Sequence, residues 1–186
     1  WFAGYPDLAA APGPYAIEKG FGVFDPTLDP TRESTYEFLE IFLREMSALF
    51  PDEYLHIGGD ENNGKQWDAN PKIQQWMKDH SIADNHGLQA YFNERVNKML
   101  SANGKRMIGW DEILQPDLPK TCVIQSWRGK EALVEAAKGG YQVMLSSGYY
   151  IDLCETAEQH YLNDPVPAEA SSLTETELAN IVGGEA

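Results

Sequence analysis

Cysteine is scarce in this sequence. Its 186 residues include two, Cys122 and Cys154, and neither belongs to a CxxC pair or to a cluster of cysteine and histidine. The arrangement does not match the usual spacing of zinc ligands, so no metal site is expected. Each cysteine lies at one end of an apolar run, and we therefore expect two buried free thiols.

Basic residues are also few. Fourteen Lys and Arg residues stand against 29 Asp and Glu residues, which gives a net charge of −15. So acidic a chain repels the phosphates of nucleic acids and anionic membrane surfaces, and neither is expected as a partner. No apolar run is long enough to span a bilayer, and no Asn-x-Ser/Thr glycosylation sequence occurs.

Aromatic residues, in contrast, are plentiful. Five Trp and nine Tyr residues provide flat apolar faces, which pack well on sugar rings, although most of them are expected in the core. The length fits one ordinary domain with a sizeable core. The chain begins at Trp1 without a Met or a signal peptide and stops at Gly-Gly-Glu-Ala. We expect a chain that is truncated at both ends.

Helices are predicted wherever apolar residues recur at helical spacing. The clearest predicted helix begins at Ser34, and we expect Ser34 and Glu37 to form a capping box at its start. Pro71 opens a second helix. A third helix, over 87–101, is predicted to end at Asn103-Gly104 in the left-handed conformation. The predicted helical ranges are 34–50, a helix from 71, 87–101, 130–138 and 174–181. Residues 1–30 and 62–70 are predicted to be loops.

One stretch, Tyr54 to Glu61, carries the main functional signal. It reads Tyr-Leu-His-Ile-Gly-Gly-Asp-Glu. The apolar start predicts a buried parallel strand, and the two glycines permit a bulge or a close approach to the backbone. Barrel enzymes place their catalytic groups at the carboxyl ends of strands, where Asp60 and Glu61 would lie. The alternative is a polar turn after a core strand.

Further short strands are predicted at 106–110, 121–127 and 142–146. Short apolar strands that alternate with helices are typical of a parallel sheet covered on both faces. Each predicted strand also ends in an aromatic or acidic residue, whereas an open sheet gathers ligand residues at its switch point. This favours an α/β fold of the closed (β/α)8 barrel type.

These motifs resemble those of family 20 glycoside hydrolases, the β-N-acetylhexosaminidases. The resemblance begins with His56-Ile57-Gly58-Gly59-Asp60-Glu61 and continues in the family's order to the end of the chain. The other matching motifs are Trp67 with Asn70-Pro71, Gly109-Trp110, Gln125-Ser126-Trp127, Tyr150-Ile151-Asp152 and Gly183-Gly184-Glu185-Ala186.

Some of the family's motifs are missing. The substrate-gripping Arg of the first strand, the Asp-containing motif that ends in Pro-Gly-His, and the Trp and Glu after Gly-Gly-Glu-Ala do not occur here. The resemblance therefore implies a partial (β/α)8 TIM barrel, roughly strands four to eight. Residues 1–186 would be part of a single glycoside hydrolase catalytic domain.

The resemblance also implies roles for individual residues. Glu61 would be the general acid and then the base, and Asp60 would orient the substrate's 2-acetamido group and stabilise an oxazolinium intermediate. Tyr150 would donate its hydroxyl to the acetamido oxygen. Trp110 and Trp127 would enclose the acetamido methyl group, and Asp152 would bind a ring hydroxyl.

Several residues near these motifs have two interpretations. Tyr149 takes the role of Tyr150 if the register differs by one residue. His56 is expected to be a core histidine, with a supporting role beside a carboxylate as the alternative. Asp111 and Glu112 are interpreted as rim or turn residues, and Trp67 as packing within its loop.

The implied activity is hydrolysis of terminal N-acetyl-β-hexosamine residues from glycans with retention of configuration, without a metal or an organic cofactor. The alternatives are a disaccharide-releasing enzyme of the same family and a carbohydrate-binding relative without turnover. The expected partner is a glycan that contains N-acetylhexosamine. The expected location of the full-length protein is extracellular, periplasmic or lysosomal, as is usual for the family.

Overall fold

The computed structural model describes residues 1–185 and divides them into two compact units. Unit 1 comprises Trp1–Pro51 and Glu61–Asn103, and unit 2 comprises Asp52–Asp60 and, among the described residues, 104–185. Of the predicted closing motif Gly183 to Ala186, the last residue lies outside the described residues.

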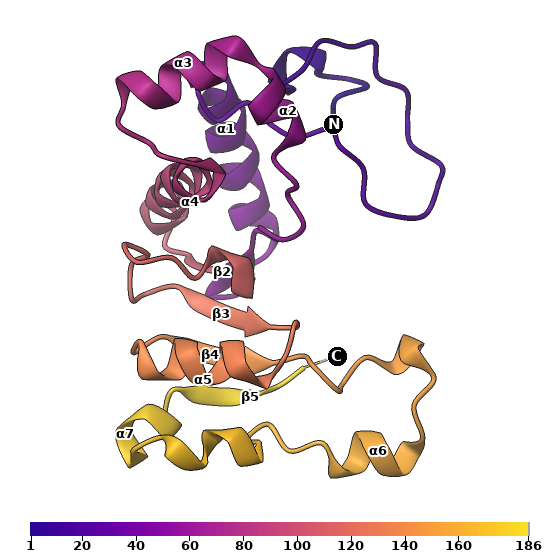
Figure 1. Cartoon of the computed structure of the whole chain (residues 1–186), viewed down its shortest axis with the longest axis vertical. Helices are drawn as coiled ribbons and strands as arrows, with labels where there is room; N and C mark the ends of the chain where they lie inside the picture. Colours follow the sequence, from indigo (N-terminus) through magenta and orange to yellow (C-terminus); the bar gives the residue numbers. More distant parts are fainter. Residues whose placement is uncertain (186) are drawn as a thin grey trace. The chain divides into compact units, whose positions relative to one another are not determined.

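Unit 2 is built on one parallel sheet (Figure 1). Its five strands pair in chain order, each one parallel to the next. Such an order places all carboxyl ends at one edge of the sheet, as in a (β/α) barrel. The strands are β1 (Tyr54–His56), β2 (Arg106–Trp110), β3 (Val123–Ser126), β4 (Gln142–Leu145) and β5 (Ile181–Gly184).

The middle of the sheet is its most buried part. All four residues of β3 are buried, because β2 and β4 pair with its two edges and α5 (Lys130–Lys138) packs against β3 and β4. The strand that begins at Tyr54 was predicted to be buried, and this prediction is wrong for the described chain. Tyr54 and His56 are exposed, since β1 is an outer strand that pairs with β2 alone in the sheet of residues 1–185.

The remaining elements of unit 2 are short. They are η2 (Asp111–Ile113), η3 (Ile151–Leu153), α6 (Ala157–Leu162), η4 (Ala168–Ser172) and α7 (Glu175–Leu178). The helix predicted over 174–181 is shorter than expected. Thr174 caps it with a capping box to Glu177, but Ile181 already belongs to β5, where it pairs with Val143.

Unit 1 is helical, with η1 (Pro6–Leu8), α1 (Glu33–Leu49), α2 (Lys65–Ala69), α3 (Pro71–Asp79) and α4 (Asn85–Ala102). The long helices α1 and α4 pack together. Arg95 of α4 forms two hydrogen bonds with the Glu33 carboxylate, at 2.5 and 2.7 Å, and its guanidinium lies 3.5 Å from the centre of the Tyr36 ring. A paired, stacked guanidinium of this kind joins the two helices specifically.

The capping box predicted for Ser34 and Glu37 is wrong. Helix α1 begins at Glu33, with Arg32 as N-cap and no capping side chain, so Ser34 already lies in the first turn. Buried Asp29 instead organises the chain before the helix. Its carboxylate accepts the Thr31 amide and hydroxyl, at 2.9 and 2.6 Å, and pairs with Arg32.

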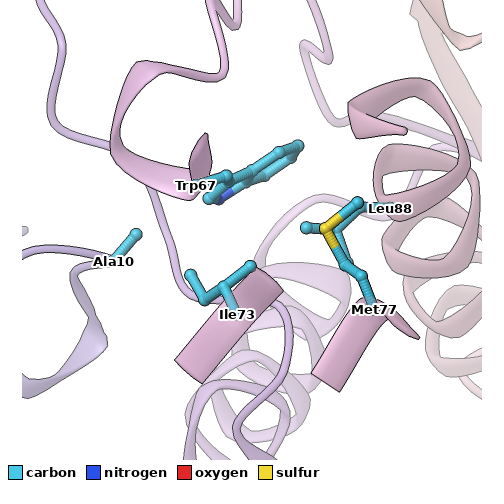
Figure 2. Packing of buried hydrophobic residues seen from close by; sticks show 5 residues of the cluster. All are labelled: Ala10, Trp67, Ile73, Met77 and Leu88. Carbon is cyan, nitrogen blue, oxygen red and sulfur yellow. The ribbon is translucent and has the colours of Figure 1, made fainter. Parts of the chain in front are cut away.

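Trp67 belongs to a cluster of buried hydrophobic residues in unit 1 (Figure 2). The loop predicted over 62–70 contains α2, which places this buried indole against Ala10, Ile73, Met77 and Leu88. The indole N–H donates to the carbonyl of Leu28 at 2.8 Å, and Ala10 also belongs to the predicted N-terminal loop. The packing interpretation of Trp67 is therefore confirmed, and the residue anchors the loop of residues 1–30.

The two cysteines differ. Cys122 is buried, as predicted, and burial raises the pKa of its thiol to about 11. Cys154 is exposed, so the prediction of a buried thiol is wrong there. Its apolar neighbours Ile151 and Leu153 lie exposed in the 3-10 helix η3. Within residues 1–185, no helix combines the length and apolar character needed to cross a membrane.

Candidate active site

The candidate site lies in unit 2, where side chains follow the carboxyl ends of neighbouring parallel strands. Asp60 comes after β1, Trp110 ends β2, Trp127 comes after β3, Tyr150 after β4 and Glu185 after β5. Because the five strands are parallel and pair in chain order, these positions share one edge of the sheet. Five of the six predicted site residues, including Asp152, belong to this unit.

The two predicted tryptophans lie beside each other. The ring centroids of Trp110 and Trp127 are 6.4 Å apart and the ring planes are inclined by 68°. Trp110 also meets the His56 ring edge to face, with centroids 5.0 Å apart. The site therefore contains an apolar aromatic cluster built from the ends of three strands.

Tyr150 lies among carboxylates. Its pKa is raised, first by the loss of hydration and then by the negative charges of Glu185, Asp152, Asp111 and Asp60. A phenol with a raised pKa keeps its proton, so Tyr150 remains a hydrogen-bond donor. Carboxylates from four different strand ends thus act on one hydroxyl group.

Tyr149 has a separate function in the structure. Its hydroxyl donates to the carbonyl of Asn163 at 2.8 Å, and its ring lies so close to Gly184 that a Cβ there would be 2.4 Å away. Its hydroxyl is therefore engaged in fixing the loop after β4. The alternative register, in which Tyr149 replaces Tyr150 in the site, is not favoured.

Two residues that sequence reasoning left out hold the aromatic cluster in place. Asp111 is 3% exposed, and its carboxylate accepts the backbone N–H groups of Trp127 and Arg128, each at 3.2 Å. It also pairs with the Arg128 guanidinium. Asp111 therefore joins the end of β2 to the segment that follows β3.

Glu112 holds the Trp127 side chain itself. The indole N–H donates to both carboxylate oxygens, at 3.0 and 3.2 Å. Loss of hydration raises the pKa of Glu112, and the hydrogen bond from Trp127 opposes that shift. The interpretation of Asp111 and Glu112 as rim or turn residues is incomplete. The sequence shows that both carboxylates directly follow a strand that ends in tryptophan, but it does not show their hydrogen-bond partners.

The backbone before the carboxylate pair is sharply turned. Gly58 and Gly59 have φ values of +73° and +90°, and Glu61 has a φ of +49°. Such values suit glycine and are uncommon for other residues, where they often mark functional positions. β1 ends at His56, so Asp60 and Glu61 lie in a turn beyond the strand. Glu61 is exposed and is the first residue of the second segment of unit 1, covalently next to Asp60.

Across residues 1–185, no three His, Cys, Asp or Glu side chains are grouped so that they could hold a metal ion.

Comparison with known proteins identifies the family. Residues 1–181 match the model of the catalytic domain of glycosyl hydrolase family 20. Among solved structures, the chitobiase of Flavobacterium johnsoniae is 47% identical, with a TM-score of 0.94, over 100% of this chain and 29% of that protein. A Vibrio harveyi exo-β-N-acetylglucosaminidase, solved in complex with N-acetylglucosamine, is 30% identical, with a TM-score of 0.74, over 86% of this chain and 28% of that protein.

The curated proteins that resemble this chain are β-hexosaminidases as well. A β-hexosaminidase of Porphyromonas gingivalis is 36% identical over 88% of this chain, and a β-hexosaminidase β subunit of Entamoeba histolytica is 32% identical over 100%. The chain spans 20% and 37% of the lengths of these relatives. The predicted partial (β/α)8 barrel is confirmed by the parallel sheet and by these structural neighbours. The chain belongs to glycosyl hydrolase family 20, within its catalytic domain.

Proposed function

We propose that the full-length protein containing this chain removes terminal, non-reducing N-acetyl-β-hexosamine residues, N-acetylglucosamine or N-acetylgalactosamine, from glycans. The main support is the placement of Asp60, Trp110, Trp127 and Tyr150 at neighbouring carboxyl ends of one parallel sheet, in a chain of this family. The names of the relatives, and the N-acetylglucosamine in the Vibrio harveyi structure, support the same activity.

The usual retaining glycosidase has two carboxyl groups, one as acid and one as nucleophile, about 5–5.5 Å apart on either side of the scissile bond. Asp60 and Glu61 are neighbours in one turn, which suits them poorly to opposite sides of one bond. Family 20 enzymes are an exception to the two-carboxylate scheme, because the substrate assists. The nucleophile we propose is therefore the carbonyl oxygen of the substrate's own 2-acetamido group.

In the first step, the Glu61 carboxylic acid gives its proton to the glycosidic oxygen. The bond from C1 to that oxygen breaks as the acetamido oxygen forms a new bond to C1, which yields an oxazolinium ring and a free alcohol. In the second step, the Glu61 carboxylate takes a proton from water while the water oxygen attacks C1. The ring then opens to restore the acetamido group, and two inversions give net retention.

Asp60 and Tyr150 act on the acetamido group. The Asp60 carboxylate accepts its N–H and offsets the positive charge of the oxazolinium ring. The protonated Tyr150 hydroxyl donates to the acetamido oxygen and orients it toward C1. Holding an internal nucleophile in an attacking position can remove up to about 7–11 kcal/mol of a barrier.

The remaining site residues bind the sugar. Trp110 and Trp127, whose rings are inclined by 68°, enclose the acetamido methyl group. Asp152 lies exposed in η3 and binds a ring hydroxyl. This arrangement explains why a substrate without the acetamido group would lose both its nucleophile and its apolar contact.

A substrate comparison tests the proposal. The full-length protein should cleave an aryl N-acetyl-β-glucosaminide rapidly and the matching aryl β-glucoside very slowly, because the glucoside carries a hydroxyl in place of the nucleophilic group. The release of the aryl alcohol gives the rate for each. Equal rates would contradict acetamido participation, and cleavage of neither would favour a disaccharide-releasing or binding-only protein.

We further propose that the chain is part of a single catalytic domain, since the family model covers residues 1–181 as one domain. The location proposed for the full-length protein is extracellular, periplasmic or lysosomal, where such glycans are degraded.

A further inference from the structure

A chain of hydrogen bonds crosses unit 2 just before the Asp60 turn. The backbone N–H of Gly58 donates to Nδ1 of His56 at 3.0 Å. The Gln125 side chain hydrogen-bonds the His56 ring. Its amide nitrogen donates to the Ser146 hydroxyl at 2.7 Å and to the Glu185 carboxylate. These bonds connect residues of β1 and β3 with the residues that directly follow β4 and β5.

The directions of these bonds assign the protons. The Gln125 amide nitrogen has two hydrogens, and both are used by Ser146 and Glu185. The part of Gln125 that faces His56 is therefore its carbonyl oxygen, which can only accept. Nδ1 of His56 also accepts, so it carries no proton, and the single ring proton lies on Nε2. His56 is held as the neutral Nε2–H tautomer.

The Gly58 peptide is held from both sides. Nδ1 of His56 accepts the N–H of Gly58, and the carbonyl of Gly58 accepts the backbone N–H of Trp110 at 2.9 Å. Gly109 makes this approach possible, because a Cβ at that position would lie 3.0 Å from the Gly58 oxygen and 2.7 Å from Ile113. Gly58, with φ of +73°, begins the turn that leads to Asp60. Fixing this peptide therefore fixes where the turn starts.

We propose that neutral His56 is a positioning residue for the proposed reaction. By accepting the Gly58 N–H it sets the path of the turn and hence the place of the Asp60 carboxylate. Gln125 and Glu185 act through His56 by keeping its ring in the required tautomer. The inference rests on the proposed function and adds a group that does not touch the substrate.

The surroundings of His56 support a neutral ring. The charged groups that act on it are the carboxylates of Asp60 and Glu185, which favour the protonated form, while Gln125 of β3 is neutral. Loss of hydration is the larger effect and lowers the pKa of His56, although the ring is exposed in the described chain. Trp110 of β2 lies edge to face with the ring, at 5.0 Å between centroids.

Acid should disturb this arrangement. Protonation places a hydrogen on Nδ1, which then opposes the Gly58 N–H instead of accepting it. Because the pKa of His56 is lowered, the neutral ring persists below the pH at which an ordinary histidine is protonated, and the turn is released at still lower pH. The acid side of the kcat profile should therefore contain an ionisation that belongs to His56.

Two substitutions in the full-length protein test this. His56→Asn keeps an acceptor near the place of Nδ1 but does not titrate, and His56→Leu removes the acceptor. We expect His56→Leu to lower kcat by about 10²-fold with little change in KM, since a misplacement of about 1 Å has this cost. His56→Asn should retain most of kcat and lose the acid-side ionisation. His86→Leu, at an exposed position in α4, is the matched control.

The outcomes separate the two proposals. A wild-type protein that cleaves the aryl N-acetyl-β-glucosaminide, together with a His56→Leu variant of nearly unchanged kcat, overturns the role of His56 alone. The role of His56 is also overturned if His56→Asn lowers kcat as much as His56→Leu does, or if the kcat profile of His56→Asn keeps the acid-side ionisation. If His56→Leu does not fold, as judged by circular dichroism, the pH profile of His56→Asn decides. A wild-type protein without turnover overturns the proposed function, and this inference with it.

Discussion

Replacing Glu61 by Gln in the full-length protein should lower kcat by about 10²–10⁴-fold, the usual contribution of a general acid–base group. Gln has nearly the same size but no proton to give to the glycosidic oxygen and no charge with which to take one from water. Steady-state hydrolysis of an aryl N-acetyl-β-glucosaminide measures the loss. Calorimetric binding of N-acetylglucosamine should change little, because hydrogen-bonding capacity at this position is kept.

The control for this substitution is Glu45→Gln, an exposed carboxylate of α1 that should leave kcat unchanged. A substrate with a very acidic aryl leaving group should regain part of the lost rate in Glu61→Gln, since such an oxygen needs less protonation. Retention of most of the activity in Glu61→Gln with ordinary substrates would remove Glu61 from the mechanism. A binding protein without turnover would show no rate to lose.

Replacing Asp60 by Asn should lower kcat by about 10²–10³-fold, the range found when one group that stabilises a developing charge is lost. Asn can still accept the acetamido N–H, but it carries no negative charge to offset the oxazolinium ring. The loss should appear in kcat more than in KM, because the charge exists in the transition state and not in the bound substrate. Rates with the same aryl substrate measure it.

The matched control is Asp52→Asn, an exposed side chain before β1 in the same unit. Its activity should equal that of the wild type. An Asp60→Asn variant within a few-fold of wild type would contradict the proposed electrostatic role. A variant that loses binding of N-acetylglucosamine as well would indicate that Asp60 holds the ground state instead.

Local sequence signals located most of the elements of the fold. Strand β2 and helix α5 begin and end at the predicted residues, because each is a periodic or apolar run between glycines or polar turns. The start of α1 was missed, since Asp29, not Ser34, organises the preceding chain through contacts of its own. The exposure of Cys154 was missed for a related reason. An apolar run does not reveal whether it enters a sheet or turns along the surface.

The candidate site likewise contains features that the sequence predicts and features that it does not. Asp60, Trp110 and Trp127 were predictable because parallel strands bring their carboxyl ends to one edge. The functions of Asp111 and Glu112 were not, since each depends on a hydrogen bond to a residue about 15 positions later in the chain. His56 likewise bonds to Gln125, far away in sequence. Such tertiary pairs leave no mark in local composition.

The central claim is that the acetamido oxygen of the substrate is the nucleophile. The most direct test is a series of aryl N-acyl-β-glucosaminides, in which the acetyl methyl group carries none, one, two or three fluorine atoms. Fluorine withdraws electrons from the carbonyl oxygen and weakens it as a nucleophile while the sugar and the leaving group stay the same. We predict that kcat of the full-length protein falls steadily with each fluorine. A kcat that does not depend on the number of fluorine atoms would contradict the account and point to a nucleophile supplied by the protein.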